Sequence, residues 1–281
     1  MKKDKHQVLR ELFPEKYQFN LSDFALFLSV MKNKPAYECT LSIILGEENL
    51  ELEEVKVEEV ILNHSGKRAI RLDAWAKDRN NREFDMEMQN DSSGDDLPKR
   101  SRFYQGMLDT PILKSGKRTR YKQLPSTTII FNTQEDIFEK DLAKYTFTEQ
   151  CEEVKDLHLE DGTTKIFLNM SSKNGSKELI SLLQYMKDTT LDNPDILVKD
   201  PRILKIDKIV NEVKESEEWE AVHMNIFEIG VNYGEERGEA RGEKRLNLLN
   251  KKLLDDNRLD DLRRSIEDET YRKKLYKEYN I

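Results

Sequence analysis

Residues that form disulfides or bind structural metals are scarce in this chain. It contains two cysteines, Cys39 and Cys151, and four scattered histidines. Two cysteines without a CxxC motif argue against a disulfide framework or a structural zinc site, and they indicate a reducing compartment. None of the histidines has metal-ligand spacing, so each is interpreted as a surface or hydrogen-bonded residue.

Long hydrophobic runs are also absent. The longest mainly apolar run, from Phe24 to Val30, spans seven residues between Asp23 and Lys32. A membrane-spanning helix needs about 20 apolar residues, and a secretory signal needs an apolar stretch after its charged start. The first residues, MKKDKHQVLRELF, contain no such stretch. We therefore expect a soluble cytoplasmic protein that contacts no membrane.

A strong excess of positive charge is missing too. The net charge is −8, so the chain as a whole does not indicate nucleic-acid binding. Hydrophobic residues make up 37% of the chain and charged residues 36%, which supports a core with much solvated helix surface. The length of 281 residues is enough for one large domain with an appendage, or for two domains.

The most informative stretch is RLDAWAKDRNNREFDMEMQ, from Arg71 to Gln89. Apolar and polar residues alternate in both of its halves, which is typical of two strands. The segment Arg79-Asn80-Asn81 between the halves suits a turn, because Asn tolerates positive φ. A turn centred on Asn80 would place Asp73 directly opposite Glu87, and Arg71 opposite Gln89.

Two carboxylates facing each other across a ladder lie about 5 Å apart and repel. Asp73 and Glu87 would therefore favour a cation between them, and Mg²⁺ is held by one or two carboxylates plus substrate phosphates. This metal-site hypothesis depends on the register, since a loop with an even number of residues would make the pair diagonal. The alternative is an ordinary hairpin with one solvated, charged face.

An Asp, a turn, and then Glu-x-Gln at the end of a second strand resemble the core of the PD-(D/E)XK nucleases. More narrowly, the chain resembles the Rpn-type recombination-promoting nucleases, also called transposases. The resembling stretches are DFALFLSVMKN (residues 23–33), RLDAWAKD (71–78), MEMQ (86–89), LPKRSRFYQGMLD (97–109), YTFTEQCEE (145–153) and DGTTKIFLN (161–169). They occur in order and cover roughly residues 20–220.

The resemblance implies an α/β fold, restriction-endonuclease-like, with a mixed sheet flanked by helices. It also implies a DNA endonuclease that depends on Mg²⁺ or Mn²⁺, with Asp73 and Glu87 as metal ligands. The superfamily usually has Lys two residues after the Glu, where this chain has Gln89, although Gln is usual in the Rpn type. The proline expected before the first Asp is Leu72 here, and Phe27 stands near the position where the family has a basic residue.

A second informative element is the helix expected from Pro98 to about Leu108. Arg100 and Tyr104 are four residues apart and share a face. Eight basic residues and one acid, Asp109, lie between Pro98 and Pro125; the basic residues are Lys99, Arg100, Arg102, Lys114, Lys117, Arg118, Arg120 and Lys122. Such a patch could contact phosphates, or it could be a solvated helix followed by a basic loop. The similar family has an Arg and a Tyr on this helix close to the active site, which correspond to Arg100 and Tyr104.

The remaining patterns predict the order of elements. Strands are expected over residues 51–63, 126–132, 145–150 and 165–169, and helices over 23–33, 35–46 and 176–188. The proline-containing segment 191–201 separates a nuclease-like domain, residues 1–190, from a helical tail, residues 200–281.

The tail contains GEERGEARGEKR, residues 234–245, a four-residue repeat in three copies. Its Glu and Arg stripes project to nearly opposite sides of a helix, so they would pair between helices rather than within one. Three mid-helix glycines cost roughly 3 kcal/mol relative to alanine, which close approach of a second helix would offset. A coiled-coil-like homo-oligomer through residues 202–281 is one interpretation, and a solvated connector is the other. The last stretch, residues 246–281, is amphipathic and predicts a small helical module.

Three functions compete at this point. The first is a metal-dependent DNA endonuclease associated with recombination or transposition, with Asp73, Glu87 and Gln89 as catalytic residues. In this interpretation Lys99, Arg100, Arg102 and Tyr104 contact DNA. The second is an inactive nuclease-fold scaffold or nucleic-acid-binding protein that assembles through its tail, and the third is a nuclease acting on RNA. The intact Asp73, Glu87 and Gln89 favour an active enzyme over a scaffold.

Overall fold

The structure of the chain is a computed structural model, which describes residues 19–63, 67–91, 94–113, 120–222, 224–225, 245–256 and 258–279. The chain forms two compact units, Met1–Trp219 and Glu220–Ile281. Each unit is described by itself below. Within the described ranges, every helix is too short or too polar to cross a bilayer.

The first unit is built on a six-stranded mixed sheet in the order β1-β2-β3-β4-β6-β5. The strands are β1 (Leu52–Ile61), β2 (Ile70–Asp78), β3 (Arg82–Gln89), β4 (Ser126–Thr133), β5 (Lys144–Phe147) and β6 (Thr163–Asn169). β1, β2 and β3 are antiparallel neighbours, whereas β3, β4 and β6 run parallel and β5 is antiparallel to β6. This arrangement confirms the predicted mixed sheet.

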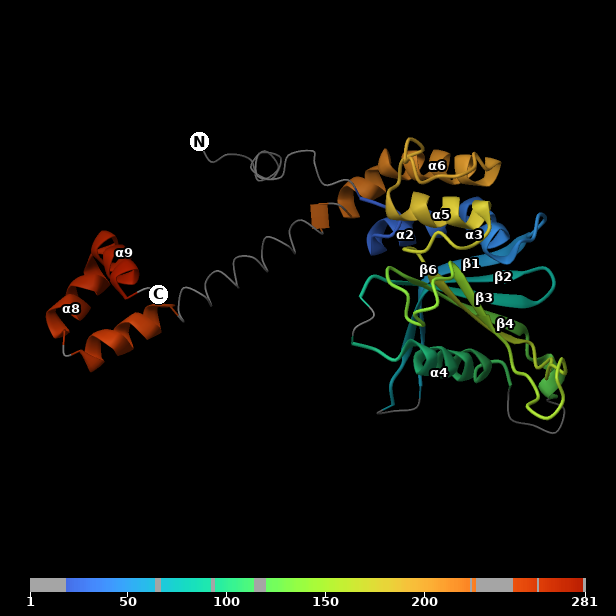
Figure 1. The fold of residues 1–281 in the computed structure, drawn as a ribbon, viewed down its shortest axis with the longest axis horizontal. Helices are drawn as coiled ribbons and strands as arrows, with labels where there is room; N and C mark the ends of the chain where they lie inside the picture. Colours follow the sequence, from blue (N-terminus) through green and yellow to red (C-terminus); the bar gives the residue numbers. More distant parts are fainter. Residues whose placement is uncertain are drawn as a thin grey trace. The chain divides into compact units, whose positions relative to one another are not determined.

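Helices cover both faces of the sheet (Figure 1). α4 (Leu97–Asp109) lies on one face, and α2 (Phe24–Met31), α3 (Lys34–Leu45), α5 (Lys177–Lys187) and α6 (Pro201–Lys214) lie on the other. The helix limits follow local signals. Pro35 stands in the first turn of α3, and Gly46 ends that helix in the left-handed region at φ +73°. The predicted α/β fold class is therefore confirmed.

The central hairpin has the register centred on Asn80, because Ala74 pairs with Met86 and Ala76 pairs with Phe84. Asn81 takes the positive φ, +60°, that the turn requires. The Asp78 carboxylate holds the turn by accepting from the backbone N–H groups of Asn80, at 2.9 Å, and Arg82, at 2.8 Å. The turn thus sets the register on which the metal-site hypothesis depends.

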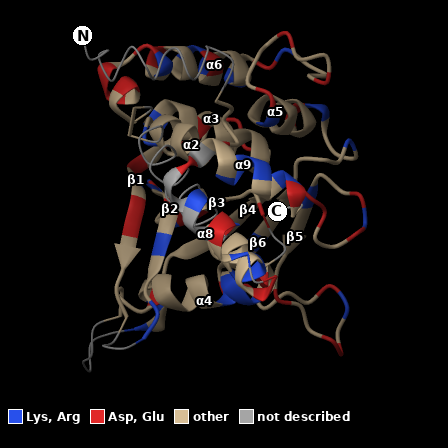
Figure 2. Ribbon diagram, turned by 90° about the vertical axis from the view of Figure 1, so that its left-hand side faces the viewer, with Lys and Arg blue, Asp and Glu red and all other residues tan. Residues whose placement is uncertain are grey.

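The alternative of a hairpin with one solvated face is wrong for this hairpin. β3 is buried along its length, because it lies in the middle of the sheet with α4 on one face. Its acids Glu83, Asp85 and Glu87 are all buried. The solvated acids lie instead on the edge strand β1, where Figure 2 shows them in red. Charge on an edge strand discourages pairing with another chain.

The second unit contains helical residues 245–255, α8 (Leu259–Glu267) and α9 (Glu269–Glu278). Leu249, Leu253 and Leu275 form its buried core, with tyrosines 271, 276 and 279 packed around them. The amphipathic module expected at the end of the chain is therefore present. The glycine repeat, apart from Arg245, lies outside the described residues.

α6 belongs to the first unit, although the sequence analysis assigns residues 200–281 to a tail. Its Ile203, Ile206 and Val210 are buried, and the helix contacts α3 and α2. Asp200 begins α6 by accepting from the backbone N–H of Arg202 at 2.8 Å. The domain limits as such stay a prediction.

Candidate active site

Asp73 and Glu87 meet where the β2–β3 ladder stops. The last backbone pair is Ala74 with Met86. Beyond it, the Asp73 N–H donates to Glu87 Oε1 at 2.9 Å, and the Met88 N–H donates to Asp73 Oδ2 at 3.0 Å. Each carboxylate thus bonds to the backbone of the other strand. The two side chains are 7% and 1% exposed, so they meet in a site largely closed to water.

An irregularity in β1 and β2 accompanies this arrangement. Glu58 has a φ of +53°, and the β1–β2 pairing omits Glu58 and Asp73 while continuing on either side. Leu72 and Trp75 lie in one hydrophobic cluster beneath α4, although residues three apart face opposite sides of a regular strand. The pairing has the same register on both sides of Glu58 and Asp73, so the interruption is local to these two residues. We attribute the orientation of Asp73 toward β3 to this irregularity.

A third carboxylate, Asp85, lies two residues before Glu87 on β3. It is fully buried, and neither of its oxygens has a hydrogen-bond partner among the residues that the structure describes. Burial, followed by repulsion from Glu87 and Asp73, raises the pKa of Asp85 well above its ordinary value. The sequence analysis did not single out Asp85. The signal that could have found it is the Asp-x-Glu spacing, which places both acids on one face of a strand.

The cluster is short of positive charge. Burial and repulsion from Asp73 raise the pKa of Glu87 to about 7, while Arg100 and Tyr104 act in the opposite direction. Burial likewise raises the pKa of Asp73. Carboxylates whose charge is disfavoured in this way bind a proton or a cation readily. The unpartnered oxygens of Asp85 and the mutual repulsion of Asp73 and Glu87 therefore fit a divalent ion.

The number of ligands limits which ion fits. Among the described residues, no group of three or more His, Cys, Asp or Glu side chains is arranged to hold a metal. Two carboxylates are nevertheless what magnesium sites on nucleic-acid enzymes require, because Mg²⁺ keeps waters and binds substrate phosphates.

α4 places Arg100 and Tyr104 against the carboxylates. Arg100 Nη2 forms an ion pair with Glu87 Oε2 and donates to the Tyr104 hydroxyl at 2.8 Å, and Arg100 Nη1 donates to Gln89 Oε1 at 2.9 Å. The guanidinium also lies over the ring of Phe131, 5.3 Å from its centroid. One cation thus joins the Glu and the Gln of the Glu-x-Gln motif.

The other two basic residues expected on this helix lie apart from the carboxylates. Lys99 pairs with Asp96 at 2.5 Å at the exposed start of α4. Arg102 is exposed. Of the loop that continues the basic segment, Lys114, Lys117 and Arg118 lie outside the described residues.

Two further contacts support the cluster. The Tyr37 hydroxyl, on α3, donates to the Ala74 carbonyl at 2.7 Å from the opposite face of the sheet. The Asn132 side chain, on β4, donates to the Glu87 carbonyl at 3.1 Å. Both fix the backbone of the strands that carry the acids.

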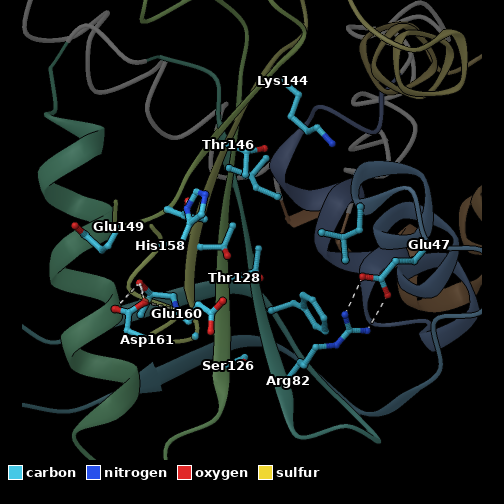
Figure 3. Close-up of a pocket in the computed structure, with 17 residues that line it drawn as sticks. Glu47, Arg82, Ser126, Thr128, Lys144, Thr146, Glu149, His158, Glu160 and Asp161 are labelled. Carbon is cyan, nitrogen blue, oxygen red and sulfur yellow. Dashed lines mark hydrogen bonds and ion pairs between the residues drawn. The ribbon is translucent and has the colours of Figure 1, made fainter. Parts of the chain in front are cut away.

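A cavity of about 560 Å³ lies elsewhere, at the start of the parallel strands and away from Glu87 (Figure 3). Arg82 in this cavity is tied to Glu47 and Asp78, and Lys144 donates to the Ile44 carbonyl at 2.9 Å. Acids also line it, among them Glu149, Glu160 and Asp161. Because its cations are engaged and its lining is acidic, this cavity does not suit a phosphate.

One of three comparisons with known proteins identifies a family. The family model described as PD-(D/E)XK nuclease family transposase matches residues 22–225, which is more than half of the chain. The comparison with curated proteins found no match, and neither did the comparison with solved structures. The matched range contains the whole sheet, the three carboxylates and α4. The chain therefore belongs to the family of PD-(D/E)XK nuclease transposases, and this membership indicates a nuclease-type function.

Proposed function

We propose that this protein is a DNA endonuclease that hydrolyses phosphodiester bonds with Mg²⁺ or Mn²⁺ and acts in recombination or transposition. The observation that carries the proposal is the buried pair Asp73 and Glu87, joined across β2 and β3 with Arg100 beside it. Family membership supports the reaction class.

Asp73 and Glu87 would hold the ion. When bound, the ion supplies polarisation of the phosphoryl oxygen and a lowered pKa of its water. Asp85, two residues before Glu87, is fully buried, and a divalent cation would relieve the repulsion from Glu87 and Asp73 that raises its pKa. Gln89 orients water through its amide and carries no charge.

Arg100 supplies the positive charge that the superfamily usually takes from Lys. Its guanidinium already contacts Glu87 and Gln89, whereas Lys99 is held at Asp96. An ion at Glu87 would compete with Arg100 for that carboxylate and leave the guanidinium available to the substrate phosphate. Arginine suits this role because its planar fork matches phosphate oxygens. Tyr104 positions Arg100 through their hydrogen bond.

Lys99 and Arg102 would contact phosphates along the DNA, which supports binding without selecting a sequence. Both lie on exposed positions of the helix that also carries Arg100. Although the net charge of the protein is negative, the basic residues of α4 would give it a local surface that attracts the DNA backbone.

A plasmid-nicking assay with Mg²⁺ or Mn²⁺ tests this function. We expect wild type to nick DNA, and we expect Asp73→Asn and Glu87→Gln, which keep side-chain volume, to lose nicking while circular dichroism stays unchanged. Glu53→Gln, on the exposed edge strand β1, is the matched control and should nick normally. Purified wild type that nicks DNA with neither ion would count against an enzyme.

A nuclease-fold scaffold is the second candidate, and the separate core of the second unit favours it. Leu248, Leu254 and Leu259 are 46%, 54% and 49% exposed around that core, which suits assembly with another chain. The scaffold candidate differs from the first in being catalytically inactive, whereas assembly through the tail could accompany either function because it does not involve the carboxylates. Activity on RNA in place of DNA is tested by the same assay with an RNA substrate.

A further inference from the structure

An aromatic cavity lies beside α4, on the same face of the sheet as the carboxylates. It has a volume of about 380 Å³ and is lined by Phe138, Phe147 and Phe167, with Arg102 and Lys165 at its margin. This volume is within the range of about 300–1,000 Å³ that is usual for small-molecule sites. None of these residues contributes to the carboxylate cluster described above.

The three rings form a preformed apolar wall. The centroid of Phe138 lies 5.0 Å from that of Phe147 and 5.2 Å from that of Phe167, and the Phe147 and Phe167 rings are nearly perpendicular, at 82°. Phe147 nevertheless remains 43% exposed on the short edge strand β5. A partly exposed aromatic held by two others presents a rigid surface at little conformational cost.

The charge around the wall is mainly positive and unengaged. Arg102 is exposed and Lys165 half-buried, and neither forms an ion pair or hydrogen bond with any residue in the described part of the chain. Phe147 pairs with Lys165 across β5 and β6, so the two side chains leave the same face of the sheet. Among the described residues, the acid that lines the cavity is Glu149. An aromatic surface flanked by free cations is the combination that binds a nucleobase together with its phosphate.

The register of the sheet places this cavity close to the carboxylates. Glu87 pairs with Phe131, and Phe131 pairs with Phe167, so the three residues lie in one row across β3, β4 and β6. Adjacent strands are about 4.8 Å apart, which puts Phe167 about 10 Å from Glu87 along the row. A nucleotide next to the one being cut could reach the wall, with its phosphate near Arg102.

We propose that this cavity binds an unpaired nucleobase adjacent to the scissile phosphate, so that the substrate is single-stranded DNA or a duplex with an unpaired nucleotide. A base inside a duplex cannot present its face to the rings, because its neighbours in the stack cover it. Glu149 accepts a hydrogen bond from an amino group of the base, and its charge keeps the phosphate on the side of Arg102 and Lys165. This proposal rests on the proposed nuclease function and names its substrate class.

The test measures binding of the full chain to labelled DNA by fluorescence anisotropy, with EDTA present so that no cleavage occurs. Phe147→Ala should weaken binding to a short single-stranded DNA about fivefold or more and leave binding to the matching duplex unchanged. Phe147→Trp, which keeps an aromatic surface, should retain the wild-type affinity. Leu204→Ala on α6, at the same 43% exposure, is the matched control and should bind as wild type does.

Two outcomes separate the failure of this proposal from the failure of the nuclease function. Suppose that wild type nicks plasmid, but that Phe147→Ala either weakens binding to single-stranded and duplex DNA equally or weakens neither. The proposed base site is then wrong, and the nuclease function stands. If wild type cleaves no DNA substrate, including a duplex with an unpaired nucleotide, the nuclease function fails and this proposal fails with it.

Discussion

Negative charge concentrated in an apolar setting is the main feature of the site at the scale of single residues. Asp73, Asp85 and Glu87 are all buried, and Arg100 is the cation that contacts Glu87. Burying an ionised carboxylate is costly unless it is paired, so the folded state raises the pKa of each acid instead. The three buried carboxylates thereby lower the stability of the fold at neutral pH.

The pH dependence of the free energy of unfolding should reveal how much the buried carboxylates destabilise the fold. The pKa of Glu87 rises from 4.5 to about 7 on folding, so its contribution to stability is present below pH 4.5 and is lost as the pH rises toward 7. In the absence of divalent ions, Glu87→Gln should therefore gain melting temperature relative to wild type as the pH increases from 4.5 to 7. Differential scanning calorimetry measures this. A constant difference between the two proteins across this pH range would contradict the raised pKa.

Mg²⁺ or Mn²⁺ should change the dependence of the melting temperature on pH. An ion competes with protons for Asp73 and Glu87, so it should raise the melting temperature of wild type more at pH 8 than at pH 5. In Glu87→Gln, the ion should raise the melting temperature much less. An equal rise in both proteins would place the ion elsewhere.

Arg100 is the second residue whose role can be separated from its neighbours. Arg100→Ala should lower the nicking rate by about 100-fold, the usual effect of removing one donor that stabilises a charged transition state. Arg100→Lys should recover part of the rate, because it keeps the charge without the planar fork. Single-turnover kinetics at saturating DNA measure both.

Lys99→Ala is the matched control for Arg100, since Lys99 is the preceding residue and pairs with the exposed Asp96. It should weaken DNA binding in a salt-dependent way and leave the saturating rate unchanged. Equal losses of rate at both positions would mean that α4 contributes general charge rather than a placed guanidinium.

Residue types and spacing predicted part of this site. Asp73 and Glu87 followed from alternation and a turn centred on Asn80, and Arg100 and Tyr104 followed from helical spacing and resemblance. Asp85 was missed because a strand pattern does not show which of its faces is buried. That depends on α4, which approaches from residues 97–109 and covers the strand only in the folded chain.

Among the elements, the β2–β3 hairpin determines whether the two carboxylates meet. Its turn holds Asn81 in the left-handed region, and the Asp78 carboxylate accepts hydrogen bonds from the turn backbone. A shift of one residue would send every side chain of β3 to the other face.

The turn can be tested by substitution at Asn81. Asn81→Val should destabilise the protein by about 1–3 kcal/mol, because a β-branched residue is strained at positive φ. Asn81→Gly should be neutral or slightly stabilising, since glycine adopts this conformation freely. Urea unfolding followed by circular dichroism measures both. Equal stability of the two variants would show that the turn residue carries no strain.

The order of strands was less accessible to prediction than the strands themselves. Segments 126–132 and 165–169 were predicted from short apolar runs, and they form β4 and β6. That β6 lies between β4 and β5 depends on long-range pairing, which local periodicity does not encode. The positive φ of Glu58 was likewise not predictable, because Glu gives no local signal for that conformation.

At the scale of the whole molecule, the residue at which the first unit ends determines how many residues the nuclease fold requires. The prolines of residues 191–201 predict a boundary there, whereas Pro201 begins α6 and the first compact unit extends to Trp219. α6 buries Ile203, Ile206 and Val210, and Trp219 further on packs edge-to-face on Phe19 at 5.2 Å. A proline at the first turn of a helix and a proline in a linker look the same in sequence.

Truncation distinguishes a first domain that ends near residue 190 from one that includes α6. A chain that ends at Val222 should keep the melting temperature of the first unit and its nicking activity. A chain that ends at Thr190 should fail to fold, because it loses three buried aliphatic side chains worth roughly 5–9 kcal/mol together. That loss is comparable with the whole stability of a typical domain, about 5–15 kcal/mol. Calorimetry and nicking of both truncations, with the full chain as control, measure the difference.

The same truncation tests the role of the second unit. If residues 223–281 mediate assembly, sedimentation equilibrium should show an oligomer for the full chain and a monomer for the chain ending at Val222, with nicking per protomer unchanged. Leu254, exposed beside the core formed by Leu249 and Leu253, suits such a contact. Leu254→Glu should therefore dissociate the full chain while its circular dichroism stays unchanged. A full chain that sediments as a monomer would instead make this unit an independent module, and the three carboxylates with Arg100 would remain a complete site within one chain.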